Sequence, residues 1–254
     1  MRVISLGWGV QSFTLAAMVA LGELEPIDAA IHSDTGYESQ LTYEFAERWT
    51  PWLESHGVRV VTVHGTDGEI DNIYTTSSKG NRFMRIPAYC EKEGKTAIMA
   101  RECTTAWKVV PVRRWLQANR NKQPVEQWIG ISLDEIERMR YSDVKYITNR
   151  YPLVEKRMTR VACQLWLERN GIEVPPKSAC VFCPYHNKAG WVKTKSIPED
   201  WQRALAVDKH IRDFDPQLKT YLTSYLKPLT ELDLSTPEEN GQMNLFDCSG
   251  TCWL

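Results

Sequence analysis

The sequence has no apolar run of the roughly 18 residues that a membrane-spanning helix needs. Its N-terminus, MRVISLGWGV, also lacks the long apolar segment of a signal peptide, so we expect a cytoplasmic protein without a membrane partner. There is no excess of charge of one sign, because 31 Lys and Arg residues stand against 32 Asp and Glu, a formal net charge of -1. This balance excludes a uniformly basic nucleic-acid-binding surface but not a local basic groove.

A disulfide framework is also absent from the sequence. The chain of 254 residues has seven cysteines, an odd number, and they are unevenly spaced at positions 90, 103, 163, 180, 183, 248 and 252. In a reducing compartment, such cysteines are core residues, metal ligands or redox thiols. The hydrophobic fraction of 43% and the charged fraction of 25% are ordinary for a globular protein and exclude disorder or a coiled coil along the whole chain.

Short apolar segments alternate with amphipathic ones through the first half of the chain. Strands are expected at 2–6, 27–32, 58–63 and 125–131, and helices at 12–24, 41–56 and 104–119. This alternation predicts an α/β fold with a doubly wound, mostly parallel sheet. Residues 65–101 show no sustained periodicity, and we interpret them as a long functional or mobile loop.

The second half predicts a small helical, cysteine-bearing C-terminal region. Helices are expected at 158–170, 201–214 and 217–225, followed by a polar, flexible segment. We therefore expect three parts, namely an α/β core at 1–150, a helical region at 151–233 and a tail at 234–254.

The turn after the first strand is suited to an anion. Gly7 and Gly9 let the backbone approach a ligand, the following helix offers unpaired N–H groups, and Ser5 and Ser12 add hydroxyls. The alternative is a tight turn with Ser12 as the helix N-cap. The turn is neither a Walker A loop nor GxGxxG.

A second polar turn, Asp34-Thr35-Gly36, follows the second strand. Ligands of open parallel sheets bind beyond the carboxyl ends of the strands, so this turn should face the first one. Asp34 can hold a ribose hydroxyl or magnesium there, and the alternative is helix N-capping by Asp34 or Thr35.

Together the two turns resemble the PP-loop superfamily of adenine nucleotide alpha-hydrolases, and most closely its phosphoadenosine phosphosulfate reductase-like branch. The Ser-Gly-Gly-x-Asp-Ser loop of that superfamily is matched by Gly-Trp-Gly-Val-Gln-Ser at 7–12. Here Gly7 replaces Ser, Trp8 replaces Gly and Gln11 replaces Asp, so the loop carries no carboxylate. Trp8 is a candidate to stack on adenine or to plug the pocket. The resemblance implies a Rossmann-like (HUP-type) topology.

Two further blocks support the resemblance. Arg-Glu-Cys-Thr-Thr at 101–105, with Lys108 and Pro111, is similar to the Cys-Thr, Lys, Pro block of the reductase-like branch. Residues 130–138 resemble the block that lines the nucleotide pocket. The resemblance implies a catalytic role for Lys108 and nucleotide contacts from Ser5, Gly7, Gly9, Gln11, Ser12, Asp34, Thr35, Gly36, Arg101, Gly130, Asp134, Glu135 and Arg138.

The only CxxC of the chain, Cys180 and Cys183, has the spacing of a zinc or iron–sulfur knuckle. Cys103 and Cys163 are the candidates to complete a four-thiolate site, and a three-thiolate site with one open iron is a further option. Within the resembling family a [4Fe-4S] cluster is favoured, with zinc as the alternative. Cys163 is otherwise a buried residue of an amphipathic helix, and Cys180 with Cys183 a structural or redox pair. Cys90 is interpreted as an ordinary thiol.

Two cysteines lie on the terminal tail. Cys248 and Cys252 stand in the place of the mobile nucleophilic cysteine of phosphoadenosine phosphosulfate reductases, so we take them as candidate catalytic thiols. The alternative is an exposed end without chemistry.

Basic residues gather around the irregular loop and the expected pocket. Arginine suits bidentate recognition of a phosphate, whether of a sulfonucleotide or of a nucleic-acid backbone. Arg101 and Arg138 are favoured because they lie in the family-like blocks; the others are Arg82, Arg85, Arg113, Arg114 and Arg140.

The sequence thus predicts an enzyme that binds ATP with Mg, cleaves it between the α and β phosphates, adenylates an acceptor and transfers sulfur to it. The acceptor is a nucleic acid or a sulfur carrier. The first alternative is a thiol-dependent reductase of phosphoadenosine phosphosulfate, and the missing loop carboxylate argues against ordinary ATP pyrophosphatase chemistry. The second is a catalytically inactive nucleotide-binding or nucleic-acid-associated module. A homodimer is left open.

Overall fold

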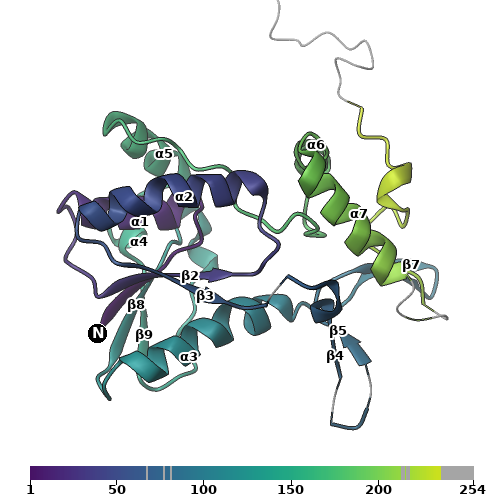
Figure 1. Ribbon diagram of the computed structural model, residues 1–254, viewed down its shortest axis with the longest axis horizontal. Coiled ribbons are helices and arrows are strands. Elements are labelled where there is room, and N and C mark those ends of the chain that lie inside the picture. Colours follow the sequence, from purple (N-terminus) through teal and green to yellow (C-terminus); the bar gives the residue numbers. More distant parts are fainter. Residues whose placement is uncertain (67, 77, 81, 213–214, 216–217, 236–254) are drawn as a thin grey trace, which may run out of the picture. The chain divides into compact units, whose positions relative to one another are not determined.

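The computed structural model of the protein describes residues 1–66, 68–76, 78–80, 82–212, 215 and 218–235. The chain divides into two compact units, shown as ribbons in Figure 1. Unit 1 comprises Met1–Ile86 and Ala100–Cys180, and unit 2 comprises Pro87–Met99 and Val181–Leu254. The chain therefore passes between the units three times. No helix among the described residues is long and apolar enough to cross a membrane.

Unit 1 is built on a five-stranded parallel sheet of order β3-β2-β1-β8-β9. The strands are β1 (Arg2–Ser5), β2 (Ala29–Asp34), β3 (Val60–His64), β8 (Val125–Ile129) and β9 (Ile147–Arg150). Along β1, Val3 pairs with Ala29 of β2 and Gln127 of β8. The expected α/β fold with a doubly wound parallel sheet is confirmed.

Helices cover both faces of this sheet (Figure 1). One core contains Ile4 and Trp128 and packs against α1 (Val10–Ala20), α2 (Gln40–Ser55), α4 (Pro152–Glu155) and α5 (Arg160–Arg169). The other contains Val3 and Val125 and packs against α3 (Val110–Asn119). Because successive strand residues point to opposite faces and both faces are covered, Val3 and Ile4, neighbours on β1, are both buried but in different cores.

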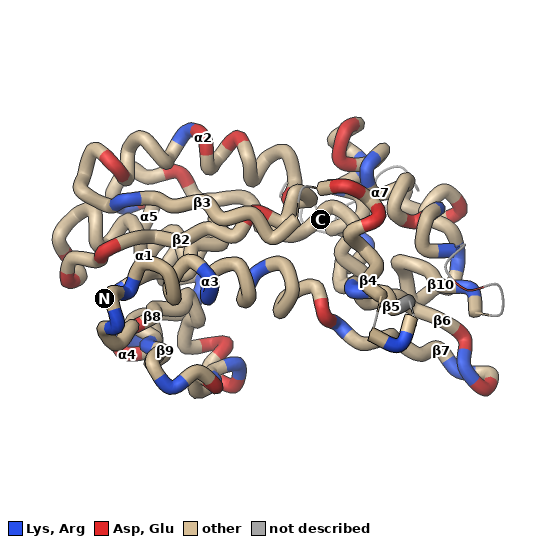
Figure 2. The backbone as a smooth tube through the Cα atoms, turned by 60° about the horizontal axis from the view of Figure 1, so that its bottom comes forward, with Lys and Arg blue, Asp and Glu red and all other residues tan. Residues whose placement is uncertain are grey.

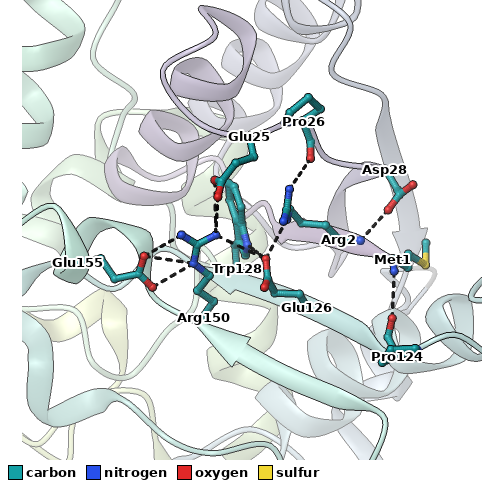
Figure 3. A network of polar contacts seen from close by, with 10 residues as sticks. All are labelled: Met1, Arg2, Glu25, Pro26, Asp28, Pro124, Glu126, Trp128, Arg150 and Glu155. Atoms are coloured by element: carbon teal, nitrogen blue, oxygen red, sulfur yellow. Dashed lines mark hydrogen bonds and ion pairs between the residues drawn. The ribbon is translucent and has the colours of Figure 1, made fainter.

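An ion-pair network joins β1, β8 and β9 in unit 1 (Figure 3). The Trp128 ring lies between the guanidinium groups of Arg2 and Arg150, whose carbons are 5.4 and 5.1 Å from its ring centroid. Glu126 Oε1 accepts hydrogen bonds from Trp128 Nε1 at 2.7 Å and from Arg2 Nε at 2.8 Å. Arg150 also pairs with Glu155. The network fixes the edge strand β9 to its neighbour.

Strand β9 was not predicted. Only Ile147 of its four residues is buried, and Asn149 and Arg150 interrupt any apolar pattern. Its pairing with β8 forms the strand despite this weak local signal.

The segment expected to be irregular at 65–101 contains short ordered elements, so that prediction was wrong for them. They are η1 (Ile70–Ile73), the antiparallel pair β4 (Tyr74–Thr76) and β5 (Arg82–Met84), and the hairpin β6 (Tyr89–Lys92) and β7 (Lys95–Ile98). Strands of three or four residues are too short to produce a recognisable period.

The described residues of unit 2 form a three-stranded antiparallel sheet, the helices α6 (Lys188–Lys195) and α7 (Pro198–Arg212), and the short η4 (Leu229–Glu231). The helix predicted at 217–225 is wrong for the described residues 218–225, where β10 (Thr220–Tyr221) pairs with β6. Leu218, Tyr221, Leu222 and Tyr225 have helical spacing, but backbone pairing with another strand overrides it. Helix α6 was missed, although Asn187 caps it by accepting from Gly190 N at 2.9 Å.

Charges of both signs occur along the tubes of both units (Figure 2). This distribution agrees with the nearly balanced count of acids and bases.

Candidate functional site

The carboxyl ends of β1 and β8 meet where the strand order changes direction. From β1 the chain proceeds to β2 and β3 on one side, and β8 joins β1 on the other. In open α/β sheets this switch point is where ligands bind. Helix α1 starts here at Val10, with Gly9 at the N-cap position and no side-chain cap. Its first-turn N–H groups and the positive end of its dipole therefore suit an anion.

Ser12 holds the turn between β1 and α1 together. Its hydroxyl accepts a hydrogen bond from Gly7 N at 3.1 Å and donates to Gly9 O at 3.3 Å. Since α1 starts at Val10, Ser12 lies inside the helix and is not its N-cap. The turn at residues 7–12, which we call the glycine loop, is thus closed around the Ser12 hydroxyl.

Gly130 lets β8 end directly against this loop. A Cβ atom at position 130 would lie 2.7 Å from Ser12 N and 2.8 Å from Ser12 Cα. Any side chain here would push the start of α1 away from the sheet, so only glycine fits this approach.

Gln11, at the position where the resembling loop has Asp, connects groups of both charges. The Gln11 side chain is buried and donates through Nε2 to Glu135 Oε2 at 3.2 Å and to Ser132 Oγ at 3.4 Å. Its Oε1 accepts from Arg160 Nη1 at 3.0 Å. A neutral amide can serve both partners at once, which a carboxylate could not do beside Glu135.

The acids after β8 have partners on both sides of the cluster, an arginine side chain for Glu135 and a backbone N–H for Asp134. Glu135 Oε1 lies 2.6 Å from Arg138 Nη1, and Asp134 Oδ1 accepts from Arg160 N at 3.0 Å. A hydrogen bond from the Ser132 side chain, aided by Arg160, holds the pKa of Asp134 below its ordinary value. The predicted residues Gln11, Asp134, Glu135 and Arg138 therefore form one cluster, which also includes Ser132 and Arg160.

The Asp34 turn at the end of β2 is organised by Asp34 itself. Asp34 Oδ1 accepts from Gly36 N and from the Tyr43 hydroxyl, both at 2.8 Å, and Oδ2 lies 3.7 Å from His64 Nδ1. Burial and the Asp34 carboxylate raise the pKa of Tyr43. Ser39 is the N-cap residue of α2, so Asp34 and Thr35 do not cap it.

Lys108 lies beside the buried Glu38 in the same unit. It belongs to a π-helical turn, η2 (Thr105–Val109), a feature that is frequent at functional sites. Lys108 Nζ is 2.9 Å from Glu38 Oε1, and the Glu38 side chain is only 1% exposed. Burial opposes the charged form of Lys108, but the Glu38 carboxylate, helped by Cys180 and Cys103, raises the pKa of Lys108 above its ordinary value. Lys108 is therefore a fixed cation at this edge.

In the described part of the chain, no three His, Cys, Asp or Glu side chains are placed to hold a metal. The four-thiolate site therefore stays a prediction. Cys180 lies against the Asp34 turn, with Sγ 3.6 Å from Thr35 Oγ1. Cys103, like Cys180, helps to raise the pKa of Lys108. Cys163 is fully buried in the α1–α5 core, and burial raises its pKa to about 11. Cys183 belongs to unit 2.

The remaining predicted residues lie in several environments. Ser5 Oγ accepts from Gln127 Nε2 at 2.6 Å, and Arg101 is exposed. Trp8 is 1% exposed and packs edge-on against His32 and Phe45, so the hypothesis that it stacks on a nucleotide is wrong. Cys248 and Cys252 lie outside the described residues.

Sequence reasoning missed three polar residues at this edge. They are Arg160, Glu38 and Ser178, whose hydroxyl donates to Glu38 Oε2 at 3.4 Å. Glu38 follows the Asp-Thr-Gly turn by two positions, and this proximity was the one available signal.

No protein-family model and no curated protein sequence matches this chain. A phosphoadenylyl-sulfate (PAPS) reductase from Candida auris, solved as a phosphate complex, is similar at 11% identity with a TM-score of 0.44, covering 68% of this chain and 74% of that one. The U34-tRNA thiolase NcsA from Methanococcus maripaludis, solved with its [4Fe-4S] cluster, is similar at 14% identity with a TM-score of 0.41, covering 85% of this chain and 66% of that one. The fold assignment rests on the chain's own strand order.

Proposed function

We propose that the chain is a PP-loop-type enzyme that binds an adenine nucleotide at the carboxyl ends of β1 and β8. The observation that carries the proposal is the close approach of Gly130 to the uncapped start of α1, at the switch point of the sheet. This arrangement leaves the first backbone N–H groups of α1 without a side-chain cap and available to a ligand, as phosphate sites at helix N-termini require.

The residues around the glycine loop would contribute to nucleotide binding in different ways. The loop N–H groups and the α1 dipole hold phosphate oxygens, while Ser12 keeps the loop closed. Arg138 and Arg160 supply positive charge on the β8 side. Lys108, with its side chain 42% exposed, supplies it on the β2 side. Cations on both sides would stabilise the charge that develops on a phosphorus centre during transfer.

The reaction we favour is cleavage of ATP between the α and β phosphates. An acceptor oxygen attacks the α phosphorus, the α–β P–O bond breaks, and pyrophosphate leaves with its bonding electrons. A sulfur donor then displaces AMP from the adenylated acceptor. The acceptor is a nucleic acid or a sulfur carrier.

Several of the described groups expected to hold magnesium or a cluster have other partners, and no step is assigned to either group. Asp34 is bonded to Gly36 N and Tyr43, and Glu135 to Gln11 and Arg138. Cys163, one of the four thiols expected for a cluster, is a core residue of the α1–α5 interface.

A second candidate is reduction of a sulfonucleotide by a thiol. The neighbourhood of Cys103 and Cys180 with Lys108 favours it, because two thiols near a fixed cation suit sulfur chemistry. The carboxyl ends of β1 and β8 with the glycine loop, which we call the nucleotide edge, would then hold phosphoadenosine phosphosulfate.

Binding and turnover of the two nucleotides test these proposals. ATP and phosphoadenosine phosphosulfate are titrated by calorimetry, and pyrophosphate and sulfite release are measured. Ser12→Ala should weaken nucleotide binding by about tenfold or more, because it opens the glycine loop. Ser55→Ala is the matched control, since the Ser55 hydroxyl bonds only at the end of α2.

Each outcome decides between the candidates. Pyrophosphate release supports ATP cleavage, and sulfite release supports the reductase. Tight binding without either product would identify a nucleotide-binding module. Equal affinities of wild type and Ser12→Ala would overturn the site itself.

A further inference from the structure

Unit 1 contains a cavity of about 620 Å³ beyond the carboxyl end of β3, separate from the glycine loop. Its wall includes His64 at the end of β3, Arg85 after β5, Glu102, Trp107 of the π-helical turn and Arg114 of α3. The volume lies within the range of small-molecule sites. None of these residues is used by the proposed nucleotide edge.

Two arginines, Arg85 and Arg114, supply positive charge to the cavity wall. Among the described residues, neither Arg85 nor Arg114 has an acidic partner, and Arg85 is held in place by donating from Nε to Tyr74 O at 3.3 Å. Arg113, next along α3, instead pairs with Asp143 and is not part of the wall. Glu102 is the one acid of the wall, so the wall contains two arginines and a single carboxylate-bearing residue.

The floor of the cavity is fixed by close packing. A Cβ atom on Gly65 would lie 2.0 Å from Trp107 O, so the π-helical turn packs directly on the end of β3. Ser33 Oγ donates to the same carbonyl at 2.7 Å, and the Trp107 ring stacks on Tyr37 at 6.1 Å. The site is thus largely preformed, which lowers the ordering cost of binding.

We propose that this cavity binds a phosphate group, at a site distinct from the nucleotide edge. Guanidinium groups match the geometry of phosphate oxygens and bind them with paired, charge-assisted hydrogen bonds. His64 lies on the rim and also approaches Asp34 of the β2 turn at 3.7 Å. The phosphate belongs to a free phosphomonoester or to the backbone of a nucleic acid, and the inference goes beyond the proposed nucleotide binding.

Calorimetric titration with inorganic phosphate tests the site on the full chain. Arg114→Gln should weaken phosphate binding by about tenfold, and Arg85→Gln with Arg114→Gln by more, because each change removes charge-assisted hydrogen bonds. Arg113→Gln is the control and should change the affinity by less than about twofold, since Arg113 lies outside the wall. Circular dichroism and thermal unfolding confirm that each variant folds, and Arg114→Lys, which keeps the charge, should retain part of the affinity.

Two further titrations separate this site from the glycine loop and identify the source of the phosphate. If Ser12→Ala abolishes phosphate binding while Arg114→Gln leaves it unchanged, phosphate occupies the loop and the inference is overturned. ATP affinity measured on the same variants reports the nucleotide edge independently. A single-stranded oligonucleotide that binds in an Arg114-dependent manner identifies a backbone phosphate, whereas Arg114-dependent binding of ribose 5-phosphate alone identifies a phosphomonoester.

Discussion

Lys108 Nζ lies 2.9 Å from Oε1 of Glu38, a carboxylate that is almost completely buried. The hydroxyls of Thr35 and Ser178 also donate to Glu38, each at 3.4 Å. Glu38 therefore links the Asp34 turn, the π-helical turn and the segment that carries Cys180. The pair positions the Lys108 cation and also stabilises this part of unit 1.

Removing only the cation of this pair should be costly. Lys108→Met leaves the Glu38 charge buried without a partner, and we expect a loss of about 1–3 kcal/mol, below the usual cost for a buried pair because Lys108 is partly exposed. Glu38→Gln combined with Lys108→Met should recover part of that loss. Urea unfolding of the two single variants and the double variant measures the coupling. Strictly additive losses would show that the pair contributes no stability.

The stability of the protein should fall as pH decreases through the range in which histidine titrates. Burial lowers the pKa of His32 below its ordinary value, so the folded protein binds this proton less readily than the unfolded chain. Stability contributed by neutral His32 is complete above the unfolded pKa of about 6.5 and decreases below it, by at most about 1.4 kcal/mol per pH unit. Denaturant unfolding between pH 7.5 and 5 should give a smaller decrease for His32→Asn than for wild type. Identical slopes would contradict this assignment.

Gly130→Ala should damage both the fold and the glycine loop. The new Cβ would meet the backbone of Ser12, so the start of α1 must move, and nucleotide affinity should fall by about tenfold or more. Gly22→Ala is the control because Gly22 has a φ of +76° with open space around it, just beyond the opposite end of α1 from the loop. That variant should lose about 1 kcal/mol of stability at unchanged nucleotide affinity. Equal nucleotide affinity in both variants would count against the loop as the binding site.

Gln11→Glu should destabilise the polar cluster after β8. The new carboxylate would replace the amide that donates to Glu135 and would repel it, at a cost of about 1–2 kcal/mol. Adding Glu135→Gln restores a donor–acceptor pair with reversed polarity and should recover most of the loss. Thermal unfolding of the single and double variants at pH 7 checks this. No recovery in the double variant would show that the Gln11–Glu135 hydrogen bond is not what Gln11 contributes.

Cys163 should be the least reactive of the described thiols that sequence analysis assigned to a metal. It is fully buried, and its pKa of about 11 keeps it protonated at neutral pH. Alkylation at pH 8 followed by mass spectrometry should modify Cys103 and Cys180, which are partly exposed, well before Cys163. If chelator treatment of the native protein made Cys163 react as fast as Cys180, Cys163 would be a metal ligand after all.

The sequence predicted the features of unit 1 that depend on local pattern. The strand at 2–6 and the helix at 41–56 are apolar or amphipathic over a full element, and both exist within two residues of the expected bounds. The glycine loop was recognisable because glycine and serine cluster between a strand and a helix. By contrast, Arg160 reaches Gln11 across 149 residues, and no local pattern indicates such a contact.

The misjudged elements depend on tertiary contacts in the same way. Thr220 forms a strand because β6 is available to pair with it, although its neighbours have helical spacing. Cys163 precedes the CxxC pair and was therefore a candidate metal ligand, but it packs as a core residue. The sequence analysis gave burial on an amphipathic helix as the alternative. The tail thiols Cys248 and Cys252 stay predictions.

The pairing of β6 with β10 constrains the order in which unit 2 forms during synthesis. Cys90 and Thr220, which pair directly, are about 130 residues apart in the chain. At typical elongation rates of about 5–20 residues per second, the β6–β7 hairpin waits on the order of ten seconds for its partner strand. Strands β8 and β9, which complete the five-stranded sheet of unit 1 after β1, β2 and β3, emerge within that interval. The nucleotide edge can therefore mature on the ribosome while the hairpin's unpaired side is still exposed to chaperones or to misassociation.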